Sequence, residues 1–124
     1  MNKDERTWPE PLQQTYAAWV NTVGEEGVRK DKLYIETSDQ HRSSGHHFFV
    51  DCIGVLDTHR GNGYAKALLQ YCFYLSNANP VSDGVALDTE AAKNVAFYQR
   101  LGYELKGESD IEGMQCWHFF KPNN

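Results

Sequence analysis

A pair of glycines at the expected start of a helix is the stretch whose residue types point most directly to chemistry. Residues 59–69 read HRGNGYAKALL, and Gly61 and Gly63 flank a single Asn before a run of helix formers. Backbone N–H groups at a helix N-terminus have no partner within the helix and, together with the helix dipole, attract an anion. Glycine lets a pyrophosphate approach the backbone because it has no Cβ. The stretch indicates either such an anion site or a tight strand-to-helix turn.

Two well-known phosphate-binding motifs fit this loop poorly. A Walker-type loop requires G-x-x-x-x-G-K-[ST], whereas Gly63 is followed by Tyr64 and Ala65. The dinucleotide fingerprint G-x-G-x-x-G would need its third glycine at Lys66, and no clear acidic residue stands about 20 positions further on. The Walker-type loop is therefore excluded, and the dinucleotide reading is weak.

The first half of the chain predicts one helix and a hairpin before the glycine loop. A helix is expected from about residue 10 to 23, because apolar residues recur there at helical spacing and Gly24 and Gly27 follow. Residues 32–37 and 47–56 are rich in β-branched and aromatic residues on either side of a polar stretch, which predicts two strands of a hairpin. The second strand is almost entirely apolar and is therefore expected to be central.

The second half predicts two further helices and three strands. A helix should run from Tyr64 until Pro80 prevents its continuation, and residues 85–87 form a short buried strand. Asp88 or Thr89 can cap the next helix, which Gly102 ends, and two strands follow around Gly113. The order α-β-β-α-β-α-β-β predicts an α/β fold, a mixed sheet flanked by helices.

Composition narrows the class of protein. With 124 residues, of which 40% are apolar, the chain is expected to be a single domain over residues 1–124, with residues 1–8 disordered. A formal net charge of −5 argues against a non-specific nucleic-acid binder. The three cysteines are odd in number and lack C-x-x-C spacing, which favours reduced thiols, no metal and a cytoplasmic location. No run of about 18 apolar residues occurs, so no membrane insertion is expected.

Two segments together resemble the GNAT superfamily of acyl-CoA-dependent N-acyltransferases. RGNGYA, at residues 60–65, resembles the family's Arg/Gln-x-x-Gly-x-Gly/Ala signature and follows a predicted strand that includes Val55. LDTEAAKNVAFYQRLGYELKGE, at residues 87–108, looks like the later strand, helix and Asn-x-x-x-Tyr-x-x-x-Gly-Phe/Tyr stretch of that family. The resemblance implies a mostly antiparallel central sheet and acetyl-CoA as co-substrate.

The resemblance also implies roles for particular residues. The coenzyme A pyrophosphate would rest on the backbone of Arg60, Gly61, Asn62, Gly63, Tyr64 and Ala65. The pantetheine arm would pair with Ile53, Gly54 and Val55, and Asn94 would approach it. Tyr98 corresponds to the family's tyrosine near the thioester sulfur, the usual general acid, although a core aromatic is its ordinary role.

Transfer to an amine also needs a base, because an amine with a pKa of about 10.4 is mostly protonated at pH 7. Asp51, expected on the central strand, is the leading candidate, directly or through water, and burial would have to raise its pKa. His46, His47 and His118 are rivals with pKa values nearer neutrality. A structural, hydrogen-bonding carboxylate is an equally good interpretation of Asp51.

Family members are commonly longer before the cofactor strand, so the fold is expected to be truncated at its N-terminal part. The absent region normally supplies much of the acceptor pocket, and its loss would expose a sheet edge and core surface. We therefore expect a homodimer and an acetyl acceptor that is an amine of a small molecule or protein, attacked directly in a ternary complex. The alternative is a non-catalytic domain that binds coenzyme A or a partner.

Overall fold

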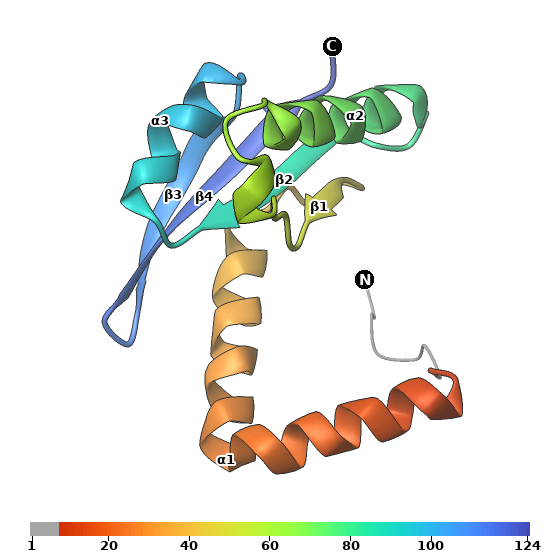
Figure 1. Cartoon of the computed structure of the whole chain (residues 1–124), viewed down its shortest axis with the longest axis vertical. Coiled ribbons are helices and arrows are strands. Elements are labelled where there is room, and N and C mark those ends of the chain that lie inside the picture. Colours follow the sequence, from red (N-terminus) through yellow and green to blue (C-terminus); the bar gives the residue numbers. More distant parts are fainter. Residues whose placement is uncertain (1–7) are drawn as a thin grey trace. The chain divides into compact units, whose positions relative to one another are not determined.

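The computed structural model describes residues 8–124 of the chain, in two compact units that meet between Glu36 and Thr37. For residues 1–7, the prediction of disorder lies outside the described residues. The elements labelled in Figure 1 follow the order α1 (Glu10–Gln40), β1 (Phe48–Val50), α2 (Tyr64–Ala78), β2 (Gly84–Thr89), α3 (Ala92–Arg100), β3 (Glu104–Ile111) and β4 (Met114–Pro122). A short 3-10 helix, η1 (Asp57–His59), precedes α2.

The first long helix, α1, is interrupted at Gly24, which has φ 74° and ψ 177°. The predicted break is therefore present, but the chain resumes its helix and continues to Gln40. The strand predicted for residues 32–37 is wrong. Helix formers follow the break, and an ion pair joins Glu26 to Arg29 one turn later. β-propensity depends on packing context, so this helical run overrides the β-branched residues that follow.

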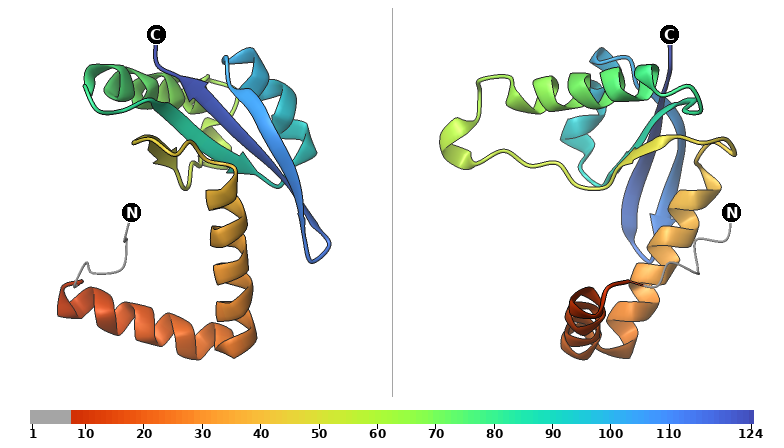
Figure 2. Two further views of the ribbon diagram at one scale, coloured as in Figure 1. Left: turned by 180° about the vertical axis from the view of Figure 1, so that it is seen from behind. Right: turned by 90° about the vertical axis from the view of Figure 1, so that its right-hand side faces the viewer.

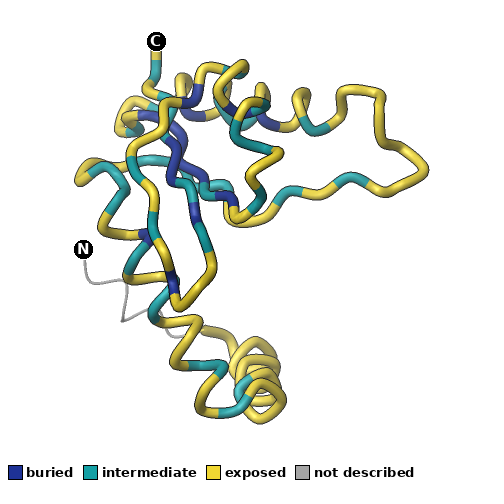
Figure 3. Tube along the Cα trace, turned by 90° about the vertical axis from the view of Figure 1, so that its left-hand side faces the viewer, coloured by how far each residue is buried: buried dark blue, intermediate teal, exposed yellow. Residues whose placement is uncertain are grey.

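The N-terminal unit carries its aromatic side chains at the surface. The rings of Trp8 and Tyr16 lie 5.7 Å apart, and those of Tyr16 and Trp19 lie 5.6 Å apart. None of the residues described in this unit, 8–36, is buried, and Figure 3 shows the buried positions gathered in the other unit. The aromatic stripe of the predicted helix is thus an exposed face within this unit.

The C-terminal unit is built on a four-stranded sheet in the order β1-β2-β4-β3. β1 pairs with β2 in parallel, while β4 runs antiparallel to both of its neighbours, which confirms the mixed, mostly antiparallel sheet (Figure 2). The predicted hairpin before the glycine loop is wrong, and the long central strand of residues 47–56 is reduced to the three-residue edge strand β1. After Val50 the chain diverges from β2, and β1 ends.

The remaining predicted elements are confirmed. α2 ends at Ala78, two residues before Pro80, and Gly102 follows α3 with φ 90°. β3 and β4 form a hairpin whose turn has positive φ at Glu112 and Gly113, as a tight two-residue turn requires. These elements depend on short-range turn chemistry, which the sequence displays directly.

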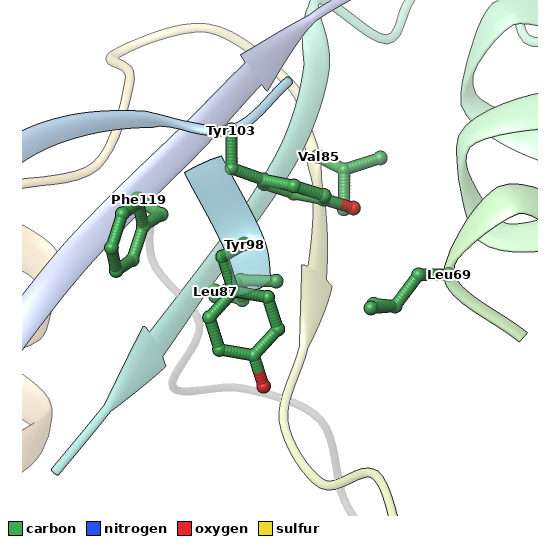
Figure 4. Packing of buried hydrophobic residues seen from close by; sticks show 6 residues of the cluster. All are labelled: Leu69, Val85, Leu87, Tyr98, Tyr103 and Phe119. Carbon is green, nitrogen blue, oxygen red and sulfur yellow. The ribbon is translucent and has the colours of Figure 1, made fainter. Parts of the chain in front are cut away.

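The hydrophobic core lies between the sheet and the helices α2 and α3. Leu69 of α2 and Tyr98 of α3 pack against alternate residues of β2 and β4, together with Tyr103 (Figure 4). Leu69 and Tyr98 share one cluster with Val85, Leu87 and Phe119, so both helices cover the same face of the sheet. Within residues 8–124, no helix combines the length and apolar character needed to cross a membrane.

The start of β2 provides a test of this packing. A Cβ added to Gly84 would overlap the carbonyl oxygen of Lys121 and lie 2.7 Å from the Phe120 ring. We expect Gly84→Ala to lower the free energy of unfolding by about 1–3 kcal/mol, measured by urea denaturation, because the neighbouring strand must shift. Gly54→Ala is the matched control, since no atom lies within 4 Å of its added Cβ. Equal urea midpoints for the two variants would contradict this account.

Candidate active site

The glycine loop adopts the backbone geometry that an anion site needs. Gly61 and Gly63 have φ values of 81° and 78°, and an added Cβ at either would meet no atom within 4 Å. Gly63 is the N-cap residue of α2, and no side chain caps that end within the described residues. Positive φ strains any residue with a Cβ, so glycine is required here for backbone shape. The uncapped N–H groups can donate hydrogen bonds to an anion.

Local polar contacts hold this loop against η1. The Arg60 guanidinium lies 2.9 Å from the Asp57 carboxylate, and the Asn62 side-chain amide donates to the His59 carbonyl at 3.0 Å. Both contacts are exposed, so each contributes modestly to stability. Their effect is to leave the backbone of the loop presented outward.

A cavity of about 230 Å³ opens where β1 and β2 separate, and we call it the β1–β2 gap. β1 pairs with β2 only from Phe48 to Val50, and beyond Val50 the two segments diverge. The residues that line the gap come from the end of β1, the end of β2 and α3: Val50, Asp51, Cys52, Ile53, Leu87, Asp88, Thr89, Glu90, Asn94 and Tyr98. Four predicted site residues, Asp51, Ile53, Asn94 and Tyr98, therefore meet here. The gap is bordered by acidic side chains and by no cationic one.

A larger and more apolar groove of about 690 Å³ lies between the segment 48–54 and α2. Asp51, Cys52 and Ile53 line both this groove and the β1–β2 gap. Gly54 lines the groove but not the gap. Residues 51–54 form no strand, so their backbone does not pair with β2. An elongated ligand could pair with that backbone.

Tyr98 is a buried residue of α3 that also lines the gap. The side chain is 7% exposed and packs against Phe119 with a ring separation of 5.7 Å. Figure 4 shows its hydroxyl pointing away from Tyr103 and Phe119. Burial raises the pKa of Tyr98 above its usual value near 10, and the nearby Glu90 carboxylate adds to the rise. The phenol therefore holds its proton at neutral pH and can act as a donor.

Asn94 and the end of β2 are joined by hydrogen bonds through Thr89. The Thr89 hydroxyl accepts from the backbone N–H of Ala91 at 3.2 Å and from the side-chain amide of Asn94 at 3.4 Å. The N-cap of α3 is Ala91 rather than Asp88 or Thr89, and no side chain caps this helix among the described residues. Thr89 instead fixes the turn between β2 and α3, which places Asn94 beside the gap.

The predicted bases lie in different surroundings. Asp51 is exposed and follows β1 rather than standing on a central strand. His46 is exposed, and the ring of His47 contacts the carbonyl of Gly45. His118, by contrast, is 2% exposed on the central strand β4. Of these residues, only Asp51 lines the gap directly.

His118 belongs to a buried polar network that the sequence analysis missed. Its Nδ1 atom donates to the Asp88 carboxylate at 2.9 Å, so in the neutral ring Nε2 can accept from the Ser109 hydroxyl, also at 2.9 Å. The hydroxyl of Ser38 donates to the other Asp88 oxygen. The ring of His41 stacks on His118 with centroids 4.1 Å apart. Asp88 thus carries a carboxylate that is hydrogen-bonded on both oxygens and lines the gap.

A signal for Asp88 was present in the sequence. It directly follows residues 85–87, the short strand predicted to be buried, and a carboxylate next to such a strand needs partners if it is buried. Its partners Ser38 and His118 stand 50 and 30 positions away, where no local pattern links them. Because side chains alternate along β2, Leu87 packs beneath α3 while Asp88 reaches the opposite face.

The same network contains the one group of candidate metal ligands within residues 8–124. Asp88, Cys116 and His118 place potential ligand atoms within 4.8 Å of one another. The carboxylate and the imidazole are already satisfied by Ser38, Ser109 and each other. We assign no metal to this cluster, because its polar atoms need no ion to be buried.

These features define a class of α/β domain in which a glycine loop opens a helix beside a split in the sheet. Residues 15–105 match the family model described as an acetyltransferase (GNAT) domain. The match covers more than half of the chain, so the chain belongs to the GNAT family, as its two motifs predicted.

Solved structures agree with this assignment. Arabidopsis thaliana NAA60 in complex with acetyl-CoA is 28% identical, with a TM-score of 0.52 over 60% of this chain and 47% of that chain. NAA60 in complex with a bisubstrate analogue is 29% identical, with a TM-score of 0.55 over 72% and 57%. A putative acetyltransferase from Agrobacterium tumefaciens, 22% identical with a TM-score of 0.53 over 60% and 55%, shares the fold.

The chain spans about half the length of these solved proteins. A comparison with curated proteins found no match.

Proposed function

We propose that the chain transfers an acetyl group from acetyl-CoA to an amine, which attacks the thioester directly in a ternary complex. The observation that carries this proposal is the β1–β2 gap, where Tyr98 and Asn94 meet unpaired backbone beside a carboxylate. Membership of the acetyltransferase family and the acetyl-CoA complex of a structural neighbour support it. The bisubstrate complex of NAA60 supports direct transfer.

The cofactor would lie along the loop and the separating strands. Its pyrophosphate would accept hydrogen bonds from the backbone N–H groups of residues 60–65, where Gly61 and Gly63 let the phosphate approach the backbone closely. Its pantetheine amides would pair with Ile53, Gly54 and Val55, beyond the last strand pairing of β1. A backbone N–H in that segment would also stabilise the oxyanion that forms as the amine attacks.

The leaving group defines the role proposed for Tyr98. As the tetrahedral intermediate collapses, the C–S bond breaks and the coenzyme A thiolate departs with the electron pair. The Tyr98 hydroxyl donates to this sulfur, because burial keeps the phenol protonated. The ring is fixed in the core, so the donor holds its position without reorganisation.

The acceptor must lose a proton before or during attack. A primary amine with a pKa of about 10.4 is neutral in only about 1 molecule in 2,500 at pH 7, a cost of about 4.6 kcal/mol. Three carboxylates line the gap, Asp51, Asp88 and Glu90, and we propose Asp51 or Asp88 as the group that takes that proton. Asp51 is exposed, whereas the side chain of Asp88 is 4% exposed and accepts a hydrogen bond from His118. The two residues give the proposal distinct, testable bases.

A second candidate function is coenzyme A binding without transfer. The exposure of Asp51 favours it, because an ordinary solvated carboxylate is a weak base for an amine. For either function we propose a cytoplasmic location, in which Cys52, Cys72 and Cys116 would stay reduced.

Replacing the phenol should separate binding from chemistry. We expect acetyl-CoA to raise the melting temperature, since a ligand at about 100 times its Kd adds about 2.7 kcal/mol. Tyr98→Phe should keep this shift but lower kcat about a hundredfold in a thiol-release assay with an amine panel, because only the proton donor is removed. Tyr74→Phe, on the exposed face of α2 and outside the loop and the gap, is the matched control. Unchanged kcat in Tyr98→Phe would refute the acid role, and binding without thiol release would favour the second function.

The base can be identified by a pH–rate profile. Loss of the true base should lower kcat/KM at pH 7 by a factor of about 10²–10⁴, and the deficit should shrink as pH approaches the pKa of the amine. We compare Asp51→Asn with Asp88→Asn, and use Ser109→Ala as a control that loses one hydrogen bond of the network. If neither carboxylate variant changes the profile, both assignments are wrong.

We further propose a homodimer. Large apolar side chains are exposed on α1 and α2, among them Tyr16, Trp19, Leu68 and Tyr71. Faces of this kind are commonly covered by a partner. Light scattering at micromolar concentration should give twice the mass of the chain, and Trp19→Glu should shift the protein toward monomer. A wild-type monomer would contradict the proposal.

A further inference from the structure

A basic cleft separate from the β1–β2 gap lies between α2, α3 and β4. It has a volume of about 260 Å³, and we call it the basic cleft. It is lined by Lys66, Leu69, Gln70, Arg100, Leu101, Tyr103 and Lys121. Three of these residues are cationic and none is acidic, in a chain whose net charge is −5. This local concentration of positive charge runs against the composition of the whole chain.

The three cations have no carboxylate partner within residues 8–124. None of the ion pairs in that part of the chain involves Lys66, Arg100 or Lys121. The Lys121 ammonium instead lies 3.9 Å from the centre of the Phe73 ring and 5.9 Å from that of Tyr103. Aromatic faces hold this charge in place without neutralising it. Like charges gathered in one cleft repel one another, and a bound anion would relieve that repulsion.

Tyr103 supplies a second, independent observation. Its side chain is 3% exposed, yet its hydroxyl has no hydrogen-bond partner within the structure. Figure 4 shows this hydroxyl turned toward the helix that carries Leu69, which also lines the basic cleft. Burial raises the pKa of Tyr103, and Cys72 and Tyr98 add to the rise, so the hydroxyl remains a donor. A buried donor without an acceptor is uncommon and points to an absent partner.

We propose that the basic cleft binds a phosphate monoester. Three cations suit a dianion better than a singly charged carboxylate, and a phosphate monoester carries close to two negative charges at neutral pH. Lys66 stands in the first turn of α2, three residues after Gly63 of the glycine loop. On the proposed function, which this inference depends on, the monoester is the 3′-phosphate of coenzyme A. That group sits on the ribose next to the pyrophosphate.

The test compares acetyl-CoA with acetyl-3′-dephospho-CoA, which lacks only that monoester. By calorimetry, wild-type protein should bind acetyl-CoA about tenfold to a hundredfold more tightly than the dephospho form. Arg100→Gln should weaken binding of acetyl-CoA about tenfold and leave binding of the dephospho form unchanged. Tyr103→Phe, which keeps the buried ring, should also weaken binding of acetyl-CoA and leave binding of the dephospho form unchanged. Lys93→Gln is the matched control, because Lys93 is exposed on α3 and lies outside the basic cleft.

The outcomes separate this inference from the proposed function. If both cofactor forms bind equally well and Arg100→Gln changes neither, the cofactor reading of the basic cleft is overturned while the proposed function stands. If neither form binds, the proposed function fails. Inorganic phosphate alone then decides the site: a rise in melting temperature that Arg100→Gln abolishes supports a cleft for another phosphate monoester, and no rise overturns the inference.

Discussion

The separation of β1 from β2 is the constraint on which the candidate site depends. The two strands pair in parallel for three residues, Phe48–Val50 against Val85–Leu87, and then diverge. A buried sheet normally satisfies every backbone group with a neighbouring strand. Here the segment 51–54 forms no strand, and an opening therefore separates it from β2. The paired parts of β1 and β2 pack into the core. The opening therefore has a packed strand on one side and, on the other, a segment whose backbone amides can pair with a ligand.

The alternation of side chains along β2 gives this opening two chemically different sides. Leu87 points to the face covered by α2 and α3, where Tyr98 is held by aromatic contacts. The next residue, Asp88, reaches the opposite face and pairs with His118. A phenol and a carboxylate thus reach one opening from opposite faces of one strand. That arrangement suits a reaction in which two substrates must meet from different directions.

The sequence predicted the parts of this structure that local chemistry determines. Gly61 and Gly63, Pro80, Gly102 and Gly113 mark turns and helix ends, and each stands where it was expected. The strand at residues 32–37 failed because β-branched residues there lie in a helical run whose neighbours decide the conformation. Asp88 was missed because its hydrogen bonds join residues 30 and 50 positions apart. Buried networks of this kind are properties of the tertiary fold.

Charge is distributed over the C-terminal unit in a way that the net charge conceals. The β1–β2 gap is bordered by Asp51, Asp88 and Glu90, while the basic cleft gathers cations without acidic neighbours. An amine approaching as a cation is attracted to the first region and a phosphate to the second. On the proposed function, this distribution would let an acidic chain hold an anionic cofactor and still attract a cationic acceptor.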